Sequence, residues 1–357
     1  MVNYIVSYIC HINNTNIVTS FVKDLFIGIP HILKNIDDIP LIEEKKTLIG
    51  NSILVITDGS FNLAESIILD CSYQNIIVLH NNTCSNPDPK TSNIYYLNIT
   101  DGIMCGEIRI KFLKDNNFFS SIDENIPYVS CICPTYNRHK FIPLLCKLFN
   151  DQDYPKELCE LIILDDSDAV FTDIDKYNIN GNIRYYYIEA KKSLPIGKKR
   201  NLLHQLVRGK YVVCFDDDDY YPPNRISHCI ETLRISKKKI AGSSKLFIYY
   251  SDIKKIYGFG PYSKTHATNG TLGYHYTIIF DHYYDDNGIL GEEKKFLNNF
   301  RLDMVQLDSI KTILCIAHKS NTFDKNNILQ FGDETQYILK DFVKNNDIMN
   351  IYKILFD

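Results

Sequence analysis

Residues 211–219 read YVVCFDDDD, five apolar or aromatic residues followed directly by four aspartates. An uninterrupted run rich in β-branched and aromatic residues predicts a strand that is buried on both faces. The aspartates would then lie at the carboxyl end of that strand, where open α/β sheets bind ligands. Their oxygens suit a hard cation such as Mg²⁺ or Mn²⁺, which often bridges carboxylates and phosphates. Taken alone, this acidic tetrad fits a solvated turn before Pro222 and Pro223 equally well.

Length and composition bound the protein class. The chain has 357 residues, enough for about two domains of roughly 150 residues. A hydrophobic content of 45% supports a sizeable core, and a net charge of −4 argues against a general nucleic-acid binder. The 11 cysteines include no CxxC pair, and several lie inside apolar runs. We therefore expect reduced core thiols rather than a zinc site or a disulfide framework.

The sequence offers no export or membrane signal. The amino-terminal residues lack the basic region and long apolar run of a signal peptide. No stretch approaches the roughly 18 apolar residues of a membrane-spanning helix. We expect a cytoplasmic protein without a transmembrane segment.

Alternating strand and helix patterns precede the acidic tetrad by more than a hundred residues. Residues 1–120 are expected to form a smaller α/β, Rossmann-like domain with a parallel sheet. Its predicted strands are residues 2–9, 52–57, 75–79 and 94–99, and its predicted helices are residues 16–27, 62–71 and 103–114. It contains neither GxGxxG nor GxxxxGK[ST], so its role stays open. The polar residues 121–127 are expected to be a linker.

Three polar clusters follow predicted strands in the next domain, residues 128–325. The clusters are residues 134–138, 165–167 and 216–219. Because the carboxyl ends of parallel strands share one edge, we expect one nucleotide and metal site there. A further strand is expected over residues 274–280, and helices are expected in residues 326–357.

The series of motifs resembles the GT-A fold glycosyltransferases of the family 2 type, including forms from bacteria and large DNA viruses. The matching segments are VSCICPTYNR (129–138), LIILDDS (161–167), IGKKRNL (196–202) and residues 209–219. The resemblance covers about residues 127–320 and implies a Rossmann-like mixed sheet flanked by helices. It also implies sugar transfer, usually with inversion, from a nucleotide-diphosphate donor, expected to be a UDP-sugar. The acceptor would be a hydroxyl of a glycan or protein, and a viral form would act in the host cytoplasm.

The resemblance further implies which residues border the nucleotide. They are Pro134, Tyr136, Arg138, Asp165, Asp166, Lys198 and Arg200. Asp165 or Asp166 would accept a hydrogen bond from the base or ribose. For Lys198 and Arg200 the alternative is a solvated helix face.

Asp216 and Asp218 match the DxD pattern of the resembled family. Asp218 would be the main ligand of Mn²⁺ or Mg²⁺, with Asp216 on the ribose or bound through water. Asp219 would aid the metal or acceptor. Asp217 is counted with the donor-binding residues, although in a continued strand it would point to the opposite side. His318 is a candidate further ligand, with a purely structural role as the alternative.

An inverting transfer needs a base for the acceptor hydroxyl, and the family uses an acidic pair before a short helix. Glu293, with Glu292 second, occupies that place, although a Glu stands where the family has Asp. The alternative is an ordinary helix start, where acids meet the helix dipole. No QxxRW segment occurs, which argues against a processive polysaccharide synthase.

Two other functions compete with an active transferase. A degenerate nucleotide-sugar-binding or scaffolding protein would share the donor site, and a nucleotidyltransferase would also use metal-bound carboxylates. The first domain is open between a second transferase, an acceptor-binding module and a dimerisation unit that would make a homodimer.

Overall fold

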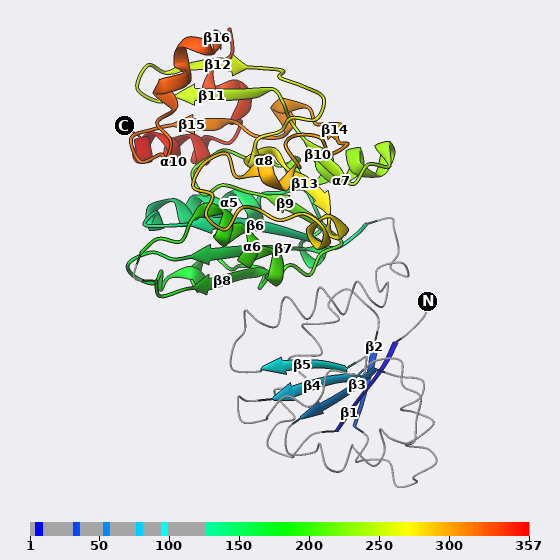
Figure 1. Ribbon diagram of the computed structural model, residues 1–357. Coiled ribbons are helices and arrows are strands. Elements are labelled where there is room, and N and C mark those ends of the chain that lie inside the picture. Colours follow the sequence, from blue (N-terminus) through cyan, green and yellow to red (C-terminus); the bar gives the residue numbers. More distant parts are fainter. Residues whose placement is uncertain are drawn as a thin grey trace. The chain divides into compact units, whose positions relative to one another are not determined.

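The computed structural model describes residues 126–190 and 192–356 and, earlier in the chain, five strands (Figure 1). The chain divides into two compact units, Met1–Ile126 and Pro127–Asp357, called unit 1 and unit 2 below.

Unit 1 contains a sheet in which every neighbouring pair of strands is parallel. Its strands are β1 (Tyr4–Ile9), β2 (His31–Asn35), β3 (Ile53–Thr57), β4 (Ile76–His80) and β5 (Ile94–Asn98), in the order β2-β1-β3-β4-β5. The four predicted strands are confirmed, and β2 was not predicted because its five residues lack a long apolar run. The helices predicted at residues 16–27, 62–71 and 103–114 lie outside the described residues.

Unit 2 holds two sheets and several helices. Its strands are β6 (Val129–Thr135), β7 (Cys159–Asp165), β8 (Ile183–Tyr187), β9 (Tyr211–Cys214), β10 (Ile240–Gly242), β11 (Leu246–Tyr250), β12 (Lys255–Phe259), β13 (Gly273–His275), β14 (Val305–Gln306), β15 (Cys315–Ala317) and β16 (Asp333–Glu334). Its α-helices are α5 (Ile142–Asn150), α6 (Ile196–Leu206), α7 (Arg225–Ser236), α8 (Glu293–Phe296), α9 (Leu339–Phe342) and α10 (Asn346–Phe356). Short 3-10 helices are η5 (His139–Phe141), η6 (Lys156–Leu158), η7 (Ile174–Lys176), η8 (Asn269–Thr271), η9 (Tyr276–Phe280), η10 (Ser309–Lys311) and η11 (Lys325–Phe331).

The main sheet has the order β14-β10-β13-β9-β6-β7-β8. Strands β9, β6, β7 and β8 are parallel, whereas β13 runs antiparallel to both β9 and β10. Every residue of β6 and β7 is buried, as their apolar runs predict. The sheet and its helices confirm the predicted mixed α/β class.

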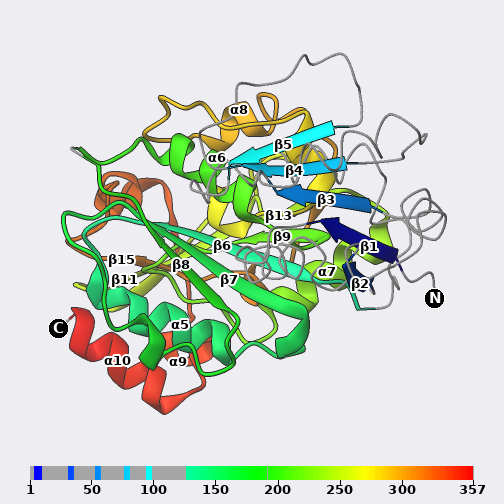
Figure 2. The same ribbon diagram turned by 90° about the horizontal axis from the view of Figure 1, so that it is seen from below.

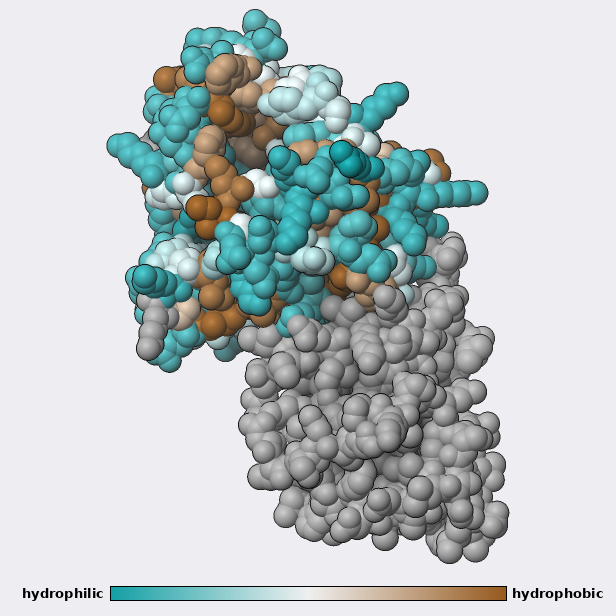
Figure 3. All heavy atoms as spheres, viewed as in Figure 1, coloured by the Kyte–Doolittle hydropathy of each residue, from teal (hydrophilic) through white to brown (hydrophobic). Residues whose placement is uncertain are grey.

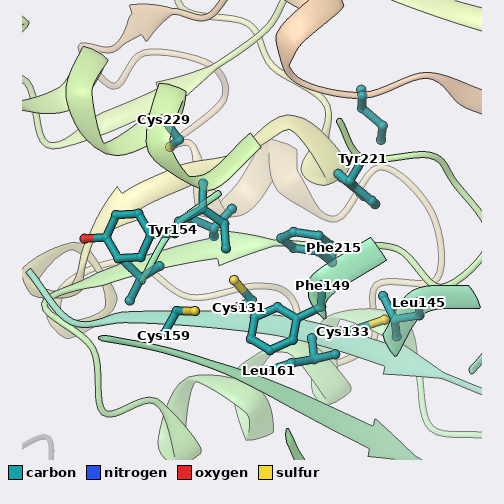
Figure 4. Close-up of a cluster of buried hydrophobic side chains, with 14 of the residues drawn as sticks. Cys131, Cys133, Leu145, Phe149, Tyr154, Cys159, Leu161, Phe215, Tyr221 and Cys229 are labelled. Atoms are coloured by element: carbon teal, nitrogen blue, oxygen red, sulfur yellow. The ribbon is translucent and has the colours of Figure 1, made fainter. Parts of the chain in front are cut away.

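Helices cover both faces of this sheet, and the alternation of strand side chains decides which residues they meet. Cys131 and Cys133 of β6 belong to the same buried cluster as residues of α5 and α7, whereas Ile132 belongs to the cluster of α6 and α8. Figure 2 shows α5 and α6 on opposite sides of the sheet. In Figure 4, Phe149 of α5 lies over the strands beside Cys131 and Cys133.

The cysteines of the described region are core residues. Seven of them lie there, all unbridged and buried: Cys131, Cys133, Cys146, Cys159, Cys214, Cys229 and Cys315. For these positions the expectation of free thiols that act as small hydrophobic side chains is confirmed.

A smaller sheet, ordered β15-β11-β12-β16, packs against the carboxyl-terminal helices. Phe247 of this sheet clusters with Phe342 of α9, with Tyr352 of α10 and with Leu148 of α5. The last part of the chain therefore ties the smaller sheet to the main one. Residues 326–357 contain the expected helices but also the short strand β16. No helix in the described part of the chain combines the length and apolar character needed to cross a membrane.

The strand predicted over residues 274–280 is wrong beyond His275. β13 ends at that residue, and η9 follows it. The imidazole of His275 accepts a hydrogen bond from the backbone N–H of Thr277, which closes a helical turn at this point. A local side-chain cap therefore overrides the apolar run of the sequence.

Candidate active site

Three polar turns meet at one edge of the main sheet. Residues 134–138 end β6, residues 165–167 end β7 and residues 216–219 follow β9. Strand β6 lies between β9 and β7, and Thr135 is the register partner of Asp165. The expected gathering of these turns at the carboxyl ends of parallel strands is confirmed.

A cavity of about 580 Å³ opens at this edge. The predicted site residues that line it are Pro134, Tyr136, Arg138, Arg200, Asp216, Asp217, Asp218, Glu292 and Glu293. Four predicted residues lie outside its lining, namely Asp165, Asp166, Lys198 and His318. The cavity thus joins the acidic tetrad to the acidic pair, although about 75 residues separate them in the sequence.

The aspartates of the tetrad do not alternate between two faces. The Asp217 carboxylate accepts a hydrogen bond from Thr135 Oγ1 at 2.6 Å and pairs with Arg138 Nη1 at 2.9 Å. The prediction that Asp217 points away from the site is therefore wrong. Strand β9 ends at Cys214, so its side-chain alternation does not continue into the tetrad.

Asp218 lies where several positive or donor groups converge. Its Oδ2 is 2.7 Å from Arg138 Nη1, 3.1 Å from His318 Nε2 and 3.0 Å from Asn321 Nδ2. Burial by itself raises the pKa of Asp218, but the His318 hydrogen bond and the charges of Lys325 and Arg138 bring that pKa below its ordinary value. Asp218 is therefore a buried carboxylate held ionised.

The side chains around Asp218 suit a metal ion that the substrate also coordinates, rather than one that the protein holds alone. His318 and Asp218 come within hydrogen-bond distance of each other. Among the residues that the structure describes, no three His, Cys, Asp or Glu side chains form a group able to hold a metal ion. An ion at Asp218 would need further oxygens, and Mg²⁺ commonly takes these from substrate phosphates and water.

Asp219 anchors the segment that follows β15. Its Oδ1 accepts hydrogen bonds from the backbone N–H of Ile316 at 2.8 Å and from Lys325 Nζ at 3.3 Å. Lys325 also donates to the Ile316 carbonyl at 2.7 Å. Burial raises the pKa of Asp219 to about 7. Sequence reasoning missed Lys325 and Asn321, because only the fold brings these residues to the tetrad.

Arg200 connects the acidic tetrad with the acidic pair. The guanidinium is buried, with Nε 2.8 Å from Glu292 Oε1 and Nη2 3.2 Å from Asp216 Oδ1. Asn269, with its amide turned so that the oxygen faces Arg200, would accept a further bond at 2.6 Å. Both carboxylates raise the pKa of Arg200 against the opposing effect of burial. Arg200 is therefore a fixed cation that bridges two carboxylates, with one contact to each.

Of the two adjacent lysines of α6, the one that reaches the cavity is Lys199, which sequence reasoning missed. Lys199 is buried, and its Nζ lies 2.8 Å from Asp166 Oδ1 and 3.3 Å from the Thr135 carbonyl. Lys198 is 42% exposed and pairs with Asp286 at 3.1 Å, outside the cavity. Helical spacing gives the reason, since Lys199 lies four residues before the buried Leu203 and on the same face.

Asp165 and Asp166 are buried, and protein groups occupy their oxygens. Asp165 accepts hydrogen bonds from Tyr185 Oη at 2.6 Å and from the backbone N–H of Ser167 at 2.9 Å. Asp166 accepts one from the backbone N–H of Leu194 at 2.6 Å, besides its pair with Lys199. In this arrangement both carboxylates position the walls of the cavity.

The two members of the acidic pair have different surroundings. Glu292 is committed to Arg200, whereas no ion pair of Glu293 occurs within the described residues. Burial, together with the charge of Glu292, raises the pKa of Glu293 to about 7. Glu293 is the first residue of α8, which holds its side chain at the cavity. It is thus the carboxylate of the pair that is able to exchange a proton near neutral pH.

The family resemblance is confirmed by comparison with known proteins. Residues 130–279 match the family model described as Glycosyl transferase family 2. TarS of Staphylococcus aureus, a poly(ribitol-phosphate) beta-N-acetylglucosaminyltransferase, is 34% identical over 93 residues, which are 26% of this chain and 16% of TarS. A GalNAc(5)-diNAcBac-PP-undecaprenol beta-1,3-glucosyltransferase of Campylobacter jejuni is 34% identical over 97 residues, which are 26% of this chain and 30% of that protein. The chain thus spans less than a third of the length of either relative.

The solved structures that resemble this one include TarS residues 1–349 in complex with UDP-GlcNAc, also from Staphylococcus aureus. The TM-score is 0.44 at 19% identity, over 64% of this chain and 66% of the TarS chain.

Proposed function

We propose that the chain is a metal-dependent, inverting glycosyltransferase, which the match of residues 130–279 to the family model described as Glycosyl transferase family 2 supports. It transfers a sugar from a nucleotide-diphosphate donor, most simply a UDP-sugar, to a hydroxyl of a glycan or protein. The observation that carries this proposal is the single cavity that unites the acidic tetrad, Arg200 and the acidic pair. Such convergence of titratable groups in one cavity is typical of a catalytic centre.

The leaving diphosphate needs positive charge. Asp218 and His318 would hold Mn²⁺ or Mg²⁺, which acts as a Lewis acid on the departing phosphate. Arg138, which contacts both Asp217 and Asp218, lies beside that position and adds a guanidinium suited to phosphate oxygens. Asp216, bound to Arg200 and 29% exposed, is left to contact the ribose or a metal-bound water.

The nucleotide would lie on the other side of the tetrad. Pro134, Tyr136 and Lys199 line this part of the cavity. The Lys199 ammonium is 5.5 Å from the centre of the Tyr136 ring, so an aromatic face and a buried cation adjoin. Asp166 supports the pocket through Lys199 and Leu194 instead of contacting the base.

Glu293 is the proposed catalytic base. It takes the proton of the acceptor hydroxyl while the hydroxyl oxygen forms its bond to the anomeric carbon. The bond from that carbon to the diphosphate oxygen breaks, and the nucleoside diphosphate leaves with the electron pair. Attack from the face opposite the leaving group inverts the anomeric centre. The two curated relatives make beta linkages by name, as inversion of an alpha-linked nucleotide sugar would.

A thermal-shift panel of nucleotide sugars with and without Mn²⁺ tests the proposal. A ligand that binds only the folded chain raises its melting temperature, and we expect this for a UDP-sugar with metal. Release of UDP should then be lost in Asp218→Ala but kept in Asp286→Ala, an exposed aspartate outside the cavity. Donor binding without turnover on any acceptor, unchanged in Glu293→Gln, would instead identify a nucleotide-sugar-binding protein. Absence of binding and hydrolysis for every nucleotide sugar would refute the proposal.

A further inference from the structure

The cavity has an apolar wall beside its acidic centre. This wall, called the apolar wall below, consists of Leu246, Ile248, Ile313 and Ile328. Leu246 and Ile248 belong to β11 of the smaller sheet. The wall adjoins the tetrad directly, because a Cβ placed on Gly270 would lie 3.0 Å from Ile313 Cδ1 and 2.5 Å from Asp216 Oδ2. Ile248 and Ile313 are only 1% exposed, so the hydrocarbon that a molecule in the cavity would meet at this wall belongs mainly to the partly exposed Leu246 and Ile328.

Two exposed apolar side chains stand at the rim of the same cavity. Ile289 is 74% exposed and Leu290 is 64% exposed, and both line the cavity. They lie between Gly288 and Gly291, immediately before the acidic pair. Large apolar side chains exposed together beside a binding site often mark a surface that a ligand covers. Figure 3 shows one face of unit 2 as largely hydrophilic, with some hydrophobic side chains gathered in a band.

Among the lining residues that the structure describes, the cavity has no unpaired cation that could bind an anionic acceptor. Carboxylates outnumber cations six to four among the lining residues. Each of the four cations is already paired with a carboxylate: Arg138, Lys199, Arg200 and Lys325. The positive charge of a divalent ion would be neutralised by the diphosphate of the donor. A phosphorylated or carboxylated acceptor would therefore meet like charge without a free partner.

We propose that the acceptor is a neutral glycoside whose aglycone is an apolar chain, which lies between the apolar wall and the rim residues Ile289 and Leu290. This inference rests on the proposed function, since it assigns the acceptor of the same cavity. The sugar hydroxyl would reach Glu293, while the chain extends over the hydrocarbon surface. Burial of that surface supplies binding energy that a small free sugar lacks.

Acceptor kinetics with the full chain test the inference. The donor and metal are those that give UDP release, and the acceptors are methyl and octyl β-glycosides of glucose, galactose and N-acetylglucosamine. We expect kcat/KM to be at least about tenfold higher for the octyl than for the methyl glycoside of the preferred sugar, because several more methylene groups are buried. The 6-phosphate of the methyl glycoside should be a poorer acceptor than the methyl glycoside itself.

A matched pair of variants locates the effect. Ile289→Ser combined with Leu290→Ser should reduce the octyl-over-methyl preference about tenfold. Ile179→Ser, which changes an isoleucine that is 78% exposed elsewhere in unit 2, should leave the preference unchanged. Equal kcat/KM for the two glycosides, or a preference for the phosphorylated acceptor, would overturn this inference while UDP release still supports the transferase. Failure to bind or hydrolyse any donor would overturn the transferase and this inference together.

Discussion

Two adjacent glutamates show how position decides the chemistry of a residue. Glu292 pairs with a buried guanidinium and places its charge beside its neighbour. That charge and the burial of Glu293 both oppose ionisation of the Glu293 carboxyl. Two carboxylates of equal chemistry therefore have different surroundings, which is why we propose Glu292 as a positioning residue and Glu293 as the proton acceptor.

The pH dependence of turnover should follow the ionisation of the Glu293 carboxyl. Only its ionised form accepts a proton, and the pKa is raised to about 7. We expect kcat/KM, which reports the ligand-free enzyme, to rise with pH through a midpoint near 7 and to level off above it. Glu293→Gln should lower kcat by roughly 10²–10⁴-fold with donor affinity kept, and Glu293→Asp should retain part of the activity. A Gln variant with full kcat would assign the base to another residue. UDP release measures turnover, and the thermal shift with the donor measures donor affinity.

Ionisation of the Glu293 carboxyl, which turnover requires, should lower the stability of the folded chain. The pKa of Glu293 is about 7 in the folded chain and 4.5 in the reference state. Its charging therefore costs the folded state stability as pH rises through that window, and the cost is complete above pH 7. Glu293→Gln should raise the melting temperature at pH 8 and leave it nearly unchanged at pH 4.5. Glu292→Gln, which weakens a buried ion pair, should lower it at both pH values. Equal effects of the two variants at pH 8 would contradict this assignment.

At the scale of elements, the sequence predicts what depends on local pattern. Strands β6, β7 and β9 are long apolar runs, so their burial and the polar turns after them follow from periodicity. The end of β13 and the start of η9 depend on the capping imidazole of His275, and the periodicity of apolar residues does not predict such a cap. The contacts of Asn321 and Lys325 with the tetrad depended on the smaller sheet, whose pairing joins distant segments.

Helix α6 supplies a further test, because adjacent lysines lie on different faces of it. Lys199 is buried beneath Tyr136 and pairs with Asp166, whereas Lys198 is half exposed. We expect Lys199→Met to weaken donor binding by about tenfold or more, since it leaves the buried Asp166 carboxylate unpaired. Lys198→Met should change donor affinity less than about twofold. Isothermal titration calorimetry with the UDP-sugar measures the donor affinity of both variants. A larger effect for Lys198 would mean that the donor lies outside the cavity described above.

At the scale of the whole molecule, every residue that the structure describes at the cavity lies in unit 2. The acidic tetrad follows β9 of the main sheet, and β11 of the smaller sheet carries Leu246 and Ile248 of the apolar wall. Asn321, which reaches Asp218, follows β15 of the smaller sheet. The described core clusters also lie entirely within Pro127–Asp357. We therefore propose that groups from the main sheet act on the donor and that the smaller sheet supplies part of the acceptor surface, at one cavity of unit 2.

We therefore expect residues 127–357 to fold and bind the donor without unit 1. Unit 2 has its own hydrophobic core and its own complete set of proposed site residues. A compact unit with these properties commonly folds alone. The truncated chain should unfold cooperatively on heating, and its UDP-sugar affinity should agree with that of the full chain within about threefold. Cooperative unfolding with lost donor binding would show that unit 1 contributes to the site. Failure to unfold cooperatively would show that unit 2 needs unit 1 for its fold, in which case the two units form one folding domain.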